Sequence, residues 1–363
     1  MLAPLTTQIV GSYSKPEWLF DRARRSSVDG SAWRVAPPHL DEARRDAARL
    51  ALHDLERAGL DLVTDGEAQR PAYDHHFYGR LAGVDIETLG VLARRNEIDD
   101  ASPTRADRAQ DGDWRRSLAP RIVGEIRWPG PLSVDEVVFA KRHASRPLKA
   151  TVVGPLTSYT KLVDEFYGDE EAAVIALADA LNAELRALEA AGADMLQIDE
   201  PAFHSRFSLA RRLGPVAIER VTRGLTLPVA VHVCYGYAYY RTSKRPSDSY
   251  ADVLRLLADC DRVDAISLEY EQPGHQPDLL RHCGAKHVIL GLLNLGTEAI
   301  ETPEHIAGRL GAALDVVPPE RLHPASDCGM WHLPRDVGFG KVSALVQGTD
   351  MIRRRLGLQT RGD

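Results

Sequence analysis

The stretch Val229-Ala230-Val231-His232-Val233-Cys234 is an apolar run that ends in an imidazole and a thiol. A nearly continuous run of aliphatic residues is typical of a parallel strand that is buried on both faces. His232 and Cys234 are two residues apart, so on one strand both side chains point to the same face. The stretch therefore predicts a buried strand that delivers two potential metal ligands to one place.

Seven further runs of this kind divide the chain. They are Gln8–Ser12, Leu62–Glu67, Lys149–Gly154, Met195–Glu200, Ala265–Glu269, His287–Asn294 and Leu322–Cys328. Longer amphipathic stretches between them predict helices, such as Glu170–Ala191, which is rich in good helix formers and is followed by Gly192. Eight strands that alternate with helices predict an α/β fold of the (β/α)8 TIM-barrel type. A doubly wound sheet is the alternative architecture.

Residues 79–146 interrupt this alternation, because their periodicity is weak and their charge is high. We expect an insertion between the second and third strands, within a single barrel domain that covers residues 1–363. The insertion is interpreted either as a small hairpin or cap, or as a surface loop in its charged part.

The composition excludes several classes of protein. The 363 residues include 45 Lys+Arg and 52 Asp+Glu, and the resulting charge of −7 argues against nucleic-acid binding. No apolar stretch approaches the roughly 20 residues that span a bilayer, and the N-terminus does not have the pattern of a signal peptide. We therefore expect a cytoplasmic protein without membrane contact, whose four cysteines are ligands or buried thiols rather than disulfides.

Polar residues follow six of the predicted strands, at the end where barrel enzymes carry their chemistry. They are Gly11-Ser12, Asp65-Gly66-Glu67, Asp199-Glu200-Pro201, His232 with Cys234, Glu269, and Asp327-Cys328. Carboxylates at such positions need partners, because burying an unpaired one costs several kcal/mol. A metal ion and a cationic group of a substrate would supply those partners.

One imidazole, two thiols and one carboxylate are ligands that a tetrahedral zinc accepts. Here they are His232, Cys234, Cys328 and Glu269. A carboxylate ligand fits an exchangeable site better than a structural one, which four firm Cys or His ligands usually close. A lone buried His or Cys is more often a packed core residue, and we expect that of Cys260 and Cys283.

Seven motifs carry a resemblance to a known family. They are Val10-Gly11-Ser12, Asp65-Gly66-Glu67, Gly154-Pro155-Leu156-Thr157, Gln197-Ile198-Asp199-Glu200-Pro201-Ala202, His232-Val233-Cys234-Tyr235-Gly236, Ser267-Leu268-Glu269 and Asp327-Cys328-Gly329-Met330. Over nearly its whole length the chain resembles the catalytic domain of cobalamin-independent methionine synthase, and more closely the short, single-domain members of that family. The resemblance implies the (β/α)8 barrel that this family shares with uroporphyrinogen decarboxylase.

The resemblance also implies a reaction and a set of site residues. The reaction is transfer of a methyl group to the thiol of homocysteine, which gives methionine. Zinc would be held by His232, Cys234, Glu269 and Cys328. Ser12 would meet the carboxylate of homocysteine, and Glu67 and Asp199 its ammonium group. The expected catalytic residues are therefore Glu67, Asp199, His232, Cys234, Glu269 and Cys328.

Two departures from the long enzymes of this family concern the methyl donor. Gly296 stands where they carry a histidine placed as an acid for the folate, and Asn294 where they carry an aspartate. The tryptophan that stacks on the pterin is replaced by Ser158-Tyr159-Thr160. The resemblance to the short members implies another donor, such as a methylated corrinoid, or folate with an accessory protein.

Aromatic and imidazole side chains near the motifs have two interpretations. Tyr235, Tyr237, Tyr239 and Tyr240 would line a donor pocket or pack as the rim of the barrel. His75 and His76 follow the Glu67 motif, and we expect them to face solvent rather than to replace the missing acid; His204 is a weaker candidate of the same kind.

Three other functions compete with homocysteine methylation. A zinc-dependent alkyltransferase could act on another thiol such as coenzyme M, but Glu67 and Asp199 suit an ammonium group that coenzyme M lacks. A lyase like uroporphyrinogen decarboxylase would use the same barrel without zinc. A non-catalytic protein with a structural zinc is the third alternative.

Overall fold

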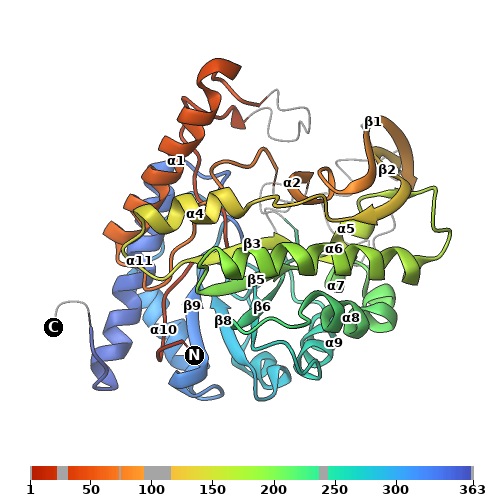
Figure 1. Cartoon of the computed structure of the whole chain (residues 1–363). Helices are drawn as coiled ribbons and strands as arrows, with labels where there is room; N and C mark the ends of the chain where they lie inside the picture. The colour runs from red at the N-terminus through yellow and green to blue at the C-terminus, as the bar shows by residue number, and fades with distance from the viewer. Residues whose placement is uncertain (1, 23–31, 73–74, 94–115, 237–243, 361–363) are drawn as a thin grey trace.

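Parallel strands form the centre of the molecule in the computed structural model, which describes residues 2–22, 32–72, 75–93, 116–236 and 244–360 (Figure 1). Their order in the sheet is the order in the chain. The strands are β3 (Lys149–Val153), β5 (Met195–Asp199), β6 (Val229–Val233), β7 (Ala265–Leu268), β8 (His287–Gly291) and β9 (Leu322–Ala325). Each lies within one of the predicted runs, and each pairs in parallel with the next.

The predicted strands Gln8–Ser12 and Leu62–Glu67 are extended segments with hydrogen bonds to their neighbours rather than regular strands. The bonds run from Gln8 N to Pro324 O at 3.1 Å, Leu62 N to Thr7 O at 3.1 Å, Val63 N to Pro147 O at 3.0 Å, and Lys149 N to Val63 O at 2.8 Å. The two segments therefore lie between β9 and β3, which completes the (β/α)8 arrangement.

Side chains explain why the first of these segments does not form a regular ladder. The Thr7 amide donates to the carboxylate of Asp61 at 2.8 Å, and the Val10 amide donates to the hydroxyl of Ser326 at 3.1 Å. An amide that binds a side chain cannot also bind the neighbouring backbone, so the regular pattern of a parallel ladder is interrupted.

Helices cover the outside of the barrel (Figure 1). The α-helices are α1 (Pro37–Ala58), α2 (His75–Tyr78), α4 (Val134–His143), α5 (Pro155–Tyr159), α6 (Glu170–Ala190), α7 (Ala202–Ser205), α8 (Phe207–Val221), α9 (Asp248–Ala258), α10 (Pro303–Leu314) and α11 (Arg335–Arg355); η2 (Pro277–Cys283) and η3 (Pro319–Arg321) are 3-10 helices. Helix α6 begins at the predicted residue and ends one residue before the predicted end, because Asp169 caps its first amides and Gly192 lies beyond its C-terminus in the left-handed region at φ 98°. Within the described residues, none of these helices is long and apolar enough to cross a membrane.

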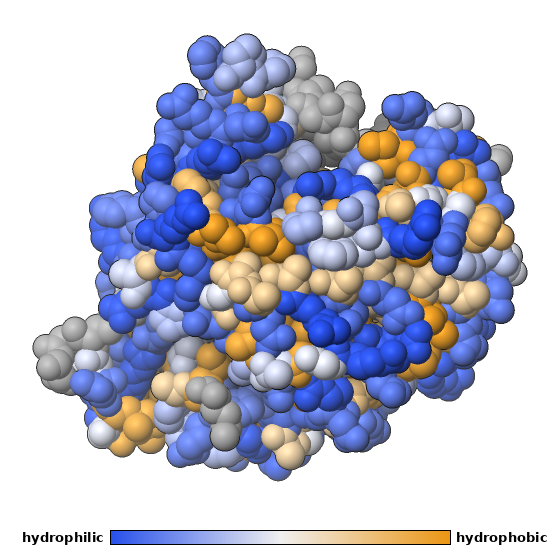
Figure 2. Space-filling model, viewed as in Figure 1, coloured by the Kyte–Doolittle hydropathy of each residue, from blue (hydrophilic) through white to orange (hydrophobic). Residues whose placement is uncertain are grey.

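An antiparallel hairpin, β1 (Ala82–Ala93) with β2 (Arg116–Arg127), occupies much of the predicted insertion. The short strand β4 (Val163–Asp164) joins β2 in parallel. Ile122 is buried against the core, whereas Val91 and Leu118 are 51% and 68% exposed. Figure 2 shows hydrophobic residues on this upper right part of the surface. Residues 94–115, which hold the charged runs of the insertion, lie outside the described part of the chain.

A layer of apolar side chains crosses the interior of the barrel. Its members are Leu62, Met195, Ala230, Ala265, Ile289 and Ala325, each at most 2% exposed. On β5, β6 and β7, and on the chain that leaves β9, the polar residues of the sequence motifs follow these positions. The layer therefore closes the barrel below those residues.

Candidate active site

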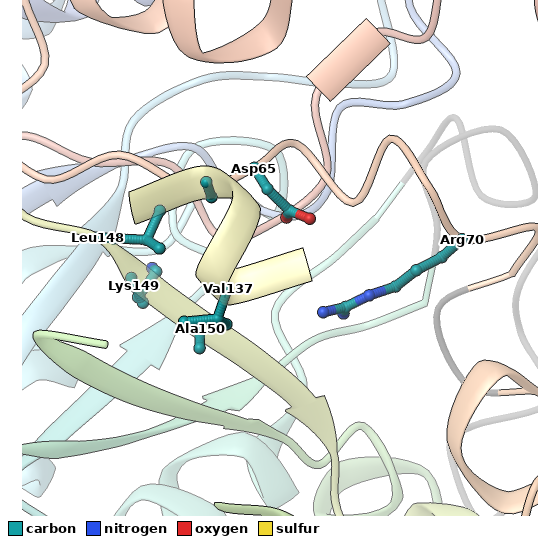
Figure 3. Close-up of a pocket in the computed structure, with 7 residues that line it drawn as sticks. Asp65, Arg70, Val137, Leu148, Lys149 and Ala150 are labelled. Carbon is teal, nitrogen blue, oxygen red and sulfur yellow. The ribbon is translucent and has the colours of Figure 1, made fainter. Parts of the chain in front are cut away.

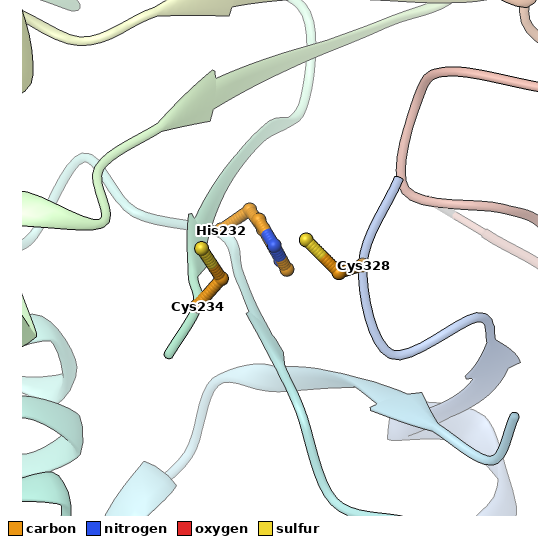
Figure 4. Close-up of side chains that lie close together, drawn as sticks. All are labelled: His232, Cys234 and Cys328. Carbon is orange, nitrogen blue, oxygen red and sulfur yellow. The ribbon is translucent and has the colours of Figure 1, made fainter. Parts of the chain in front are cut away.

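His232, Cys234 and Cys328 form a compact buried cluster. One ligand atom of each residue lies within 4.8 Å of the others. His232 and Cys234 come from the end of β6, and Cys328 follows β9, so segments almost a hundred residues apart supply the cluster. Figure 4 shows the three side chains pointing toward one another. The strand-end positions predicted from the sequence thus bring an imidazole and two thiols together.

The imidazole of His232 is oriented as a metal ligand would be. Its Nδ1 atom hydrogen-bonds to the hydroxyl of Ser267, on β7, at 2.9 Å. Its Nε2 atom is buried and makes no hydrogen bond within the described part of the chain. A metal-ligating histidine usually has one nitrogen fixed by the protein and the other free for the ion. The cluster therefore fits a metal by the state of this nitrogen as well as by its residue types.

The two thiols are not equivalent. A hydrogen bond from Cys328 lowers the pKa of Cys234 well below its usual value, and the charges of His232 and Lys244 act in the same direction against burial. The Gly236 amide donates to the Cys234 sulfur at 3.2 Å. Cys234 therefore favours the thiolate, the form in which a cysteine binds a metal.

Glu269, which directly follows β7, is held by an ion pair beside this cluster. Lys244 donates to its two carboxylate oxygens at 2.8 and 2.6 Å, and the Tyr235 amide donates to one of them at 3.0 Å. Both charged side chains are completely buried. Burial raises the pKa of Glu269, and the charge of Lys244 opposes that effect. The carboxylate thus lies outside the three-residue group, with Lys244 as its present partner.

Lys244 was not predicted from the sequence. It lies between β6 and α9 in a stretch without periodicity, and no motif includes it. The signal that could have led to it is indirect: a carboxylate at the end of a buried strand requires a cation, and Lys244 is close in sequence to the His232 motif.

Asp199 and Glu67 provide two buried carboxylates on another part of the barrel. Burial raises the pKa of Asp199 to about 7, and the nearby Glu67 contributes to the rise. Gln197 donates to Asp199 at 2.8 Å and accepts from Lys149 at 2.7 Å. Asp199 also pairs in register with His232 on β6, so the acid and the metal-type cluster lie on adjacent strands.

Glu67 has a strained backbone that aims its side chain. Its φ is 50°, in the left-handed region that non-glycine residues rarely adopt, and such strain is concentrated at functional sites. The Asp65 side chain accepts from the Glu67 amide at 2.9 Å and holds this turn. Thr151 donates to Glu67 at 2.9 Å. A Cβ at Gly11 would lie 2.4 Å from the Glu67 carboxylate, so glycine is required for this close approach.

Ser12 directly follows Gly11, the residue that the Glu67 carboxylate approaches. Its side chain is buried, and its carbonyl oxygen accepts from the Met330 amide at 2.9 Å. Because Met330 is two residues after Cys328, this bond ties the Ser12 segment to the loop that carries a cluster thiol. Every predicted site residue is therefore buried at the strand ends.

A second charged group lies behind Glu67. Arg70 donates to Glu136 at 2.9 Å and to the Thr151 hydroxyl at 3.1 Å. His76 also contacts Glu136, at 3.1 Å, and its side chain is only 9% exposed. The expectation that His76 faces solvent is therefore wrong, because the buried Glu136 on α4 recruits it as a partner.

A small cavity lies next to this group, between Asp65, Arg70 and Lys149 (Figure 3). One oxygen of Asp65 is buried without a hydrogen bond to any described residue, and burial raises the pKa of this carboxyl to about 6. Burial lowers the pKa of Lys149 to about 7. All three groups interact electrostatically with Glu67 and so contribute to the charge around it.

Two other strand-end carboxylates organise loops. Glu200 accepts from the amides of Leu156 and Thr157 at 3.0 and 2.8 Å, and so holds the start of α5. Asp327 accepts from the amides of Glu271 and Gln272 at 3.1 and 2.7 Å. These carboxylates therefore position the chain around the site.

Tyr235 packs into the rim of the barrel. Its hydroxyl hydrogen-bonds to His275 at 2.8 Å, and its ring lies 4.4 and 4.6 Å from the rings of His204 and Tyr250. This favours the packing interpretation for Tyr235. His204 is 1% exposed, so the expectation that it faces solvent like His75 and His76 is wrong; it packs against the rings of Tyr235 and Tyr250. Tyr237, Tyr239 and Tyr240 lie outside the described residues.

Comparisons with known proteins agree on one family. A family model described as the catalytic domain of cobalamin-independent synthase matches residues 5–350. Methionine synthase of Sulfurisphaera tokodaii is 31% identical over 356 residues, which cover 97% of this chain and 94% of that protein.

Two solved structures are also similar. A B12-independent methionine synthase from Shewanella sp. W3-18-1, in complex with selenomethionine, has a TM-score of 0.84 and 32% identity and covers 98% of this chain and 99% of its own. A putative vitamin-B12-independent methionine synthase from Listeria monocytogenes has a TM-score of 0.70 over 97% of this chain and 99% of its own. At 18% identity, the second likeness concerns the fold alone.

Proposed function

This chain belongs to the family of cobalamin-independent synthases, and we propose that it transfers a methyl group to the thiol of homocysteine with the help of a zinc ion. It is a methyltransferase of the methionine synthase type. His232, Cys234 and Cys328 would hold the ion, and Glu269 would serve as an exchangeable fourth ligand.

The observation that carries the proposal is the convergence of these first three side chains, in which the Nε2 atom of His232 is buried and makes no hydrogen bond within the described residues. Imidazole and thiolate ligands suit zinc, and a fourth position that is not closed by a firm ligand is typical of catalytic sites. When bound, zinc would lower the pKa of a coordinated substrate thiol and supply a sulfur nucleophile at neutral pH.

The protein's own residues would bind and orient the amino acid. Glu67 and Asp199 are buried carboxylates. Within the described residues Glu67 has a long ion pair with Arg70, at 3.9 Å, and Asp199 has none, so both suit the ammonium group of homocysteine. Ser12 would meet its carboxylate. Holding both ends of the amino acid directs its sulfur to one place, which accelerates the reaction by proximity. The selenomethionine bound by the Shewanella relative, a selenium analogue of the product, supports an amino-acid site of this kind.

The donor is proposed to bind differently from the folate of the long enzymes. Asn294 and Gly296 bond to one another at 2.9 Å and offer no ionisable group for a leaving folate. The Ser158-Tyr159-Thr160 segment has no tryptophan to stack on a pterin. A methylated corrinoid, or folate delivered with an accessory protein, is the proposed class of donor.

A donor screen with metal analysis tests the proposal. Purified protein is assayed for zinc and then incubated with homocysteine and methylcobalamin, methyl-folate with one or several glutamates, or simple methyl thioethers and sulfonium compounds. The expected result is near-stoichiometric zinc and methionine formation from one of these donors. Full activity in zinc-free protein would contradict the proposal.

A competition assay separates homocysteine from other thiols. Coenzyme M lacks the ammonium group that Glu67 and Asp199 would bind, so we expect it to compete poorly. Equal competition by coenzyme M would favour the alternative alkyltransferase function instead.

A further inference from the structure

The ion pair between Lys244 and Glu269 is unusual because it is fully buried next to a metal-type cluster. Both side chains are 0% exposed, and Lys244 binds both carboxylate oxygens. Removing one partner of such a pair leaves the other charge unpaired in the interior, which is strongly destabilising. Each of the two residues therefore constrains the position of the other.

The same carboxylate has a second potential partner. Glu269 and Lys244 interact electrostatically with the sulfurs of Cys234 and Cys328, so the ion pair adjoins the cluster. A carboxylate that lies between an ammonium group and a metal position divides its interaction between the two. A stronger bond from Glu269 to Lys244 therefore weakens the bond that Glu269 can form to the metal, and a weaker one strengthens it.

Building on the function proposed above, we propose that Lys244 is a positioning residue that draws the Glu269 carboxylate away from the His232–Cys234–Cys328 cluster. The fourth ligand position there is thereby kept exchangeable for a substrate thiol. Lys244 acts through Glu269 and does not itself contact the substrate.

Charge balance supports this role. A thiol that took the fourth position would lose its S–H proton to solvent, and one anionic ligand would replace another. The charge at the cluster is then unchanged, but the released carboxylate stays buried. Lys244 gives that carboxylate a cation with three hydrogen-bond donors, so its release does not create an unpaired buried charge.

Replacement of Lys244 by the apolar, equally long methionine tests the proposal. The Lys244→Met protein is loaded with cobalt(II), whose absorption bands report its ligands, and zinc affinity is measured by competition with a chromophoric chelator. We expect tighter zinc binding, because Glu269 loses its other partner, and cobalt bands that differ from those of the unaltered protein before any thiol is added.

Titration with homocysteine gives the second readout. Because Glu269 then occupies the fourth position more often, the apparent affinity for homocysteine should fall by about tenfold. In a Glu269→Gln background the same Lys244→Met change should cause no further fall. If Lys244→Met does not fold, Lys244→Gln carries the same prediction, since it also removes the charge.

Lys341→Met is the matched control. Lys341 is a buried lysine on α11 that pairs with Glu301 at 3.0 Å, so its loss has a similar effect on stability but involves another carboxylate. We expect it to leave the cobalt bands unchanged. An equal loss of homocysteine affinity with and without Glu269 would overturn the proposal, as would unchanged zinc affinity in Lys244→Met. If homocysteine fails to alter the cobalt bands of the unaltered protein, the proposed function itself is wrong.

Discussion

Two levels of the same barrel have opposite chemistry. At one level, Met195, Ala230 and Ala265 belong to an apolar layer that is closed to solvent. Two to four residues further along the same strands, Asp199, His232 and Glu269 are equally buried but polar or charged. Burial alone therefore does not separate core from site in this molecule.

The difference lies in how each level is stabilised. The apolar layer gains from removal of its side chains from water. The polar level instead depends on specific partners, such as Ser267 for His232 and Lys244 for Glu269. Substitutions at the polar level should therefore change binding and catalysis, whereas those in the apolar layer should change the free energy of unfolding.

The largest effect is expected from Cys328→Ser. A serine hydroxyl is a poor zinc ligand at neutral pH, so the protein should lose most of its zinc and about a thousandfold in methyl transfer. Elemental analysis and a methionine assay measure both, and circular dichroism checks the fold. Cys260→Ser, in a buried cysteine away from the cluster, is the control that should keep its zinc. Retained zinc and activity in Cys328→Ser would remove this thiol from the site.

Asp199→Asn should weaken homocysteine binding without removing the metal. Loss of a buried charge that pairs with the ammonium group should raise the Kd by about a hundredfold. Calorimetry with homocysteine measures the Kd, and zinc content should stay near that of the unaltered protein. A normal Kd in Asp199→Asn would show that the amino group binds elsewhere.

The pH dependence of methionine binding isolates the same carboxyl, since methionine has no thiol to titrate. Burial raises the pKa of Asp199 to about 7, and only the ionised form attracts an ammonium group. Affinity should therefore be full above pH 7 and fall by about tenfold per unit below it. In Asp199→Asn this dependence should flatten. An unaltered protein that binds methionine equally at pH 6 and pH 8 would contradict the assignment.

The smallest effect on activity is expected from Ile289→Ala, in the apolar layer. Loss of its buried methyl groups should lower the free energy of unfolding by about 3 kcal/mol, as measured by denaturant titration. At temperatures where the protein remains folded, zinc content and the Kd for homocysteine should be unaffected. A loss of zinc in folded Ile289→Ala would mean that the two levels are not separable.

The six strands of the central sheet could be predicted because each lies in a short, largely apolar run, and polar residues follow β5, β6, β7 and β9. Convergence of His232, Cys234 and Cys328 followed from the same pattern, since the ends of parallel strands meet at one mouth of a barrel. These features depend on local sequence and on one topological rule.

Other features depend on contacts of individual side chains. Residues 8–12 and 62–67 have the pattern of strands, but the Val10 amide donates to the side chain of Ser326, and the Gly66 and Glu67 amides donate to the side chains of Thr64 and Asp65. His76 is buried by its contact with Glu136, which is sixty residues away in the sequence. No periodic pattern in the sequence predicts that Lys244 pairs with Glu269. Only the folded structure shows that Lys244 holds the carboxylate of the proposed fourth ligand.

The most direct measurement of the central claim is X-ray absorption at the zinc edge, with and without homocysteine. The account predicts zinc with nitrogen and two sulfur ligands, from His232, Cys234 and Cys328, and a third sulfur after homocysteine is added. Bound zinc with an unchanged number of sulfur ligands, or protein without zinc that still forms methionine, would contradict it.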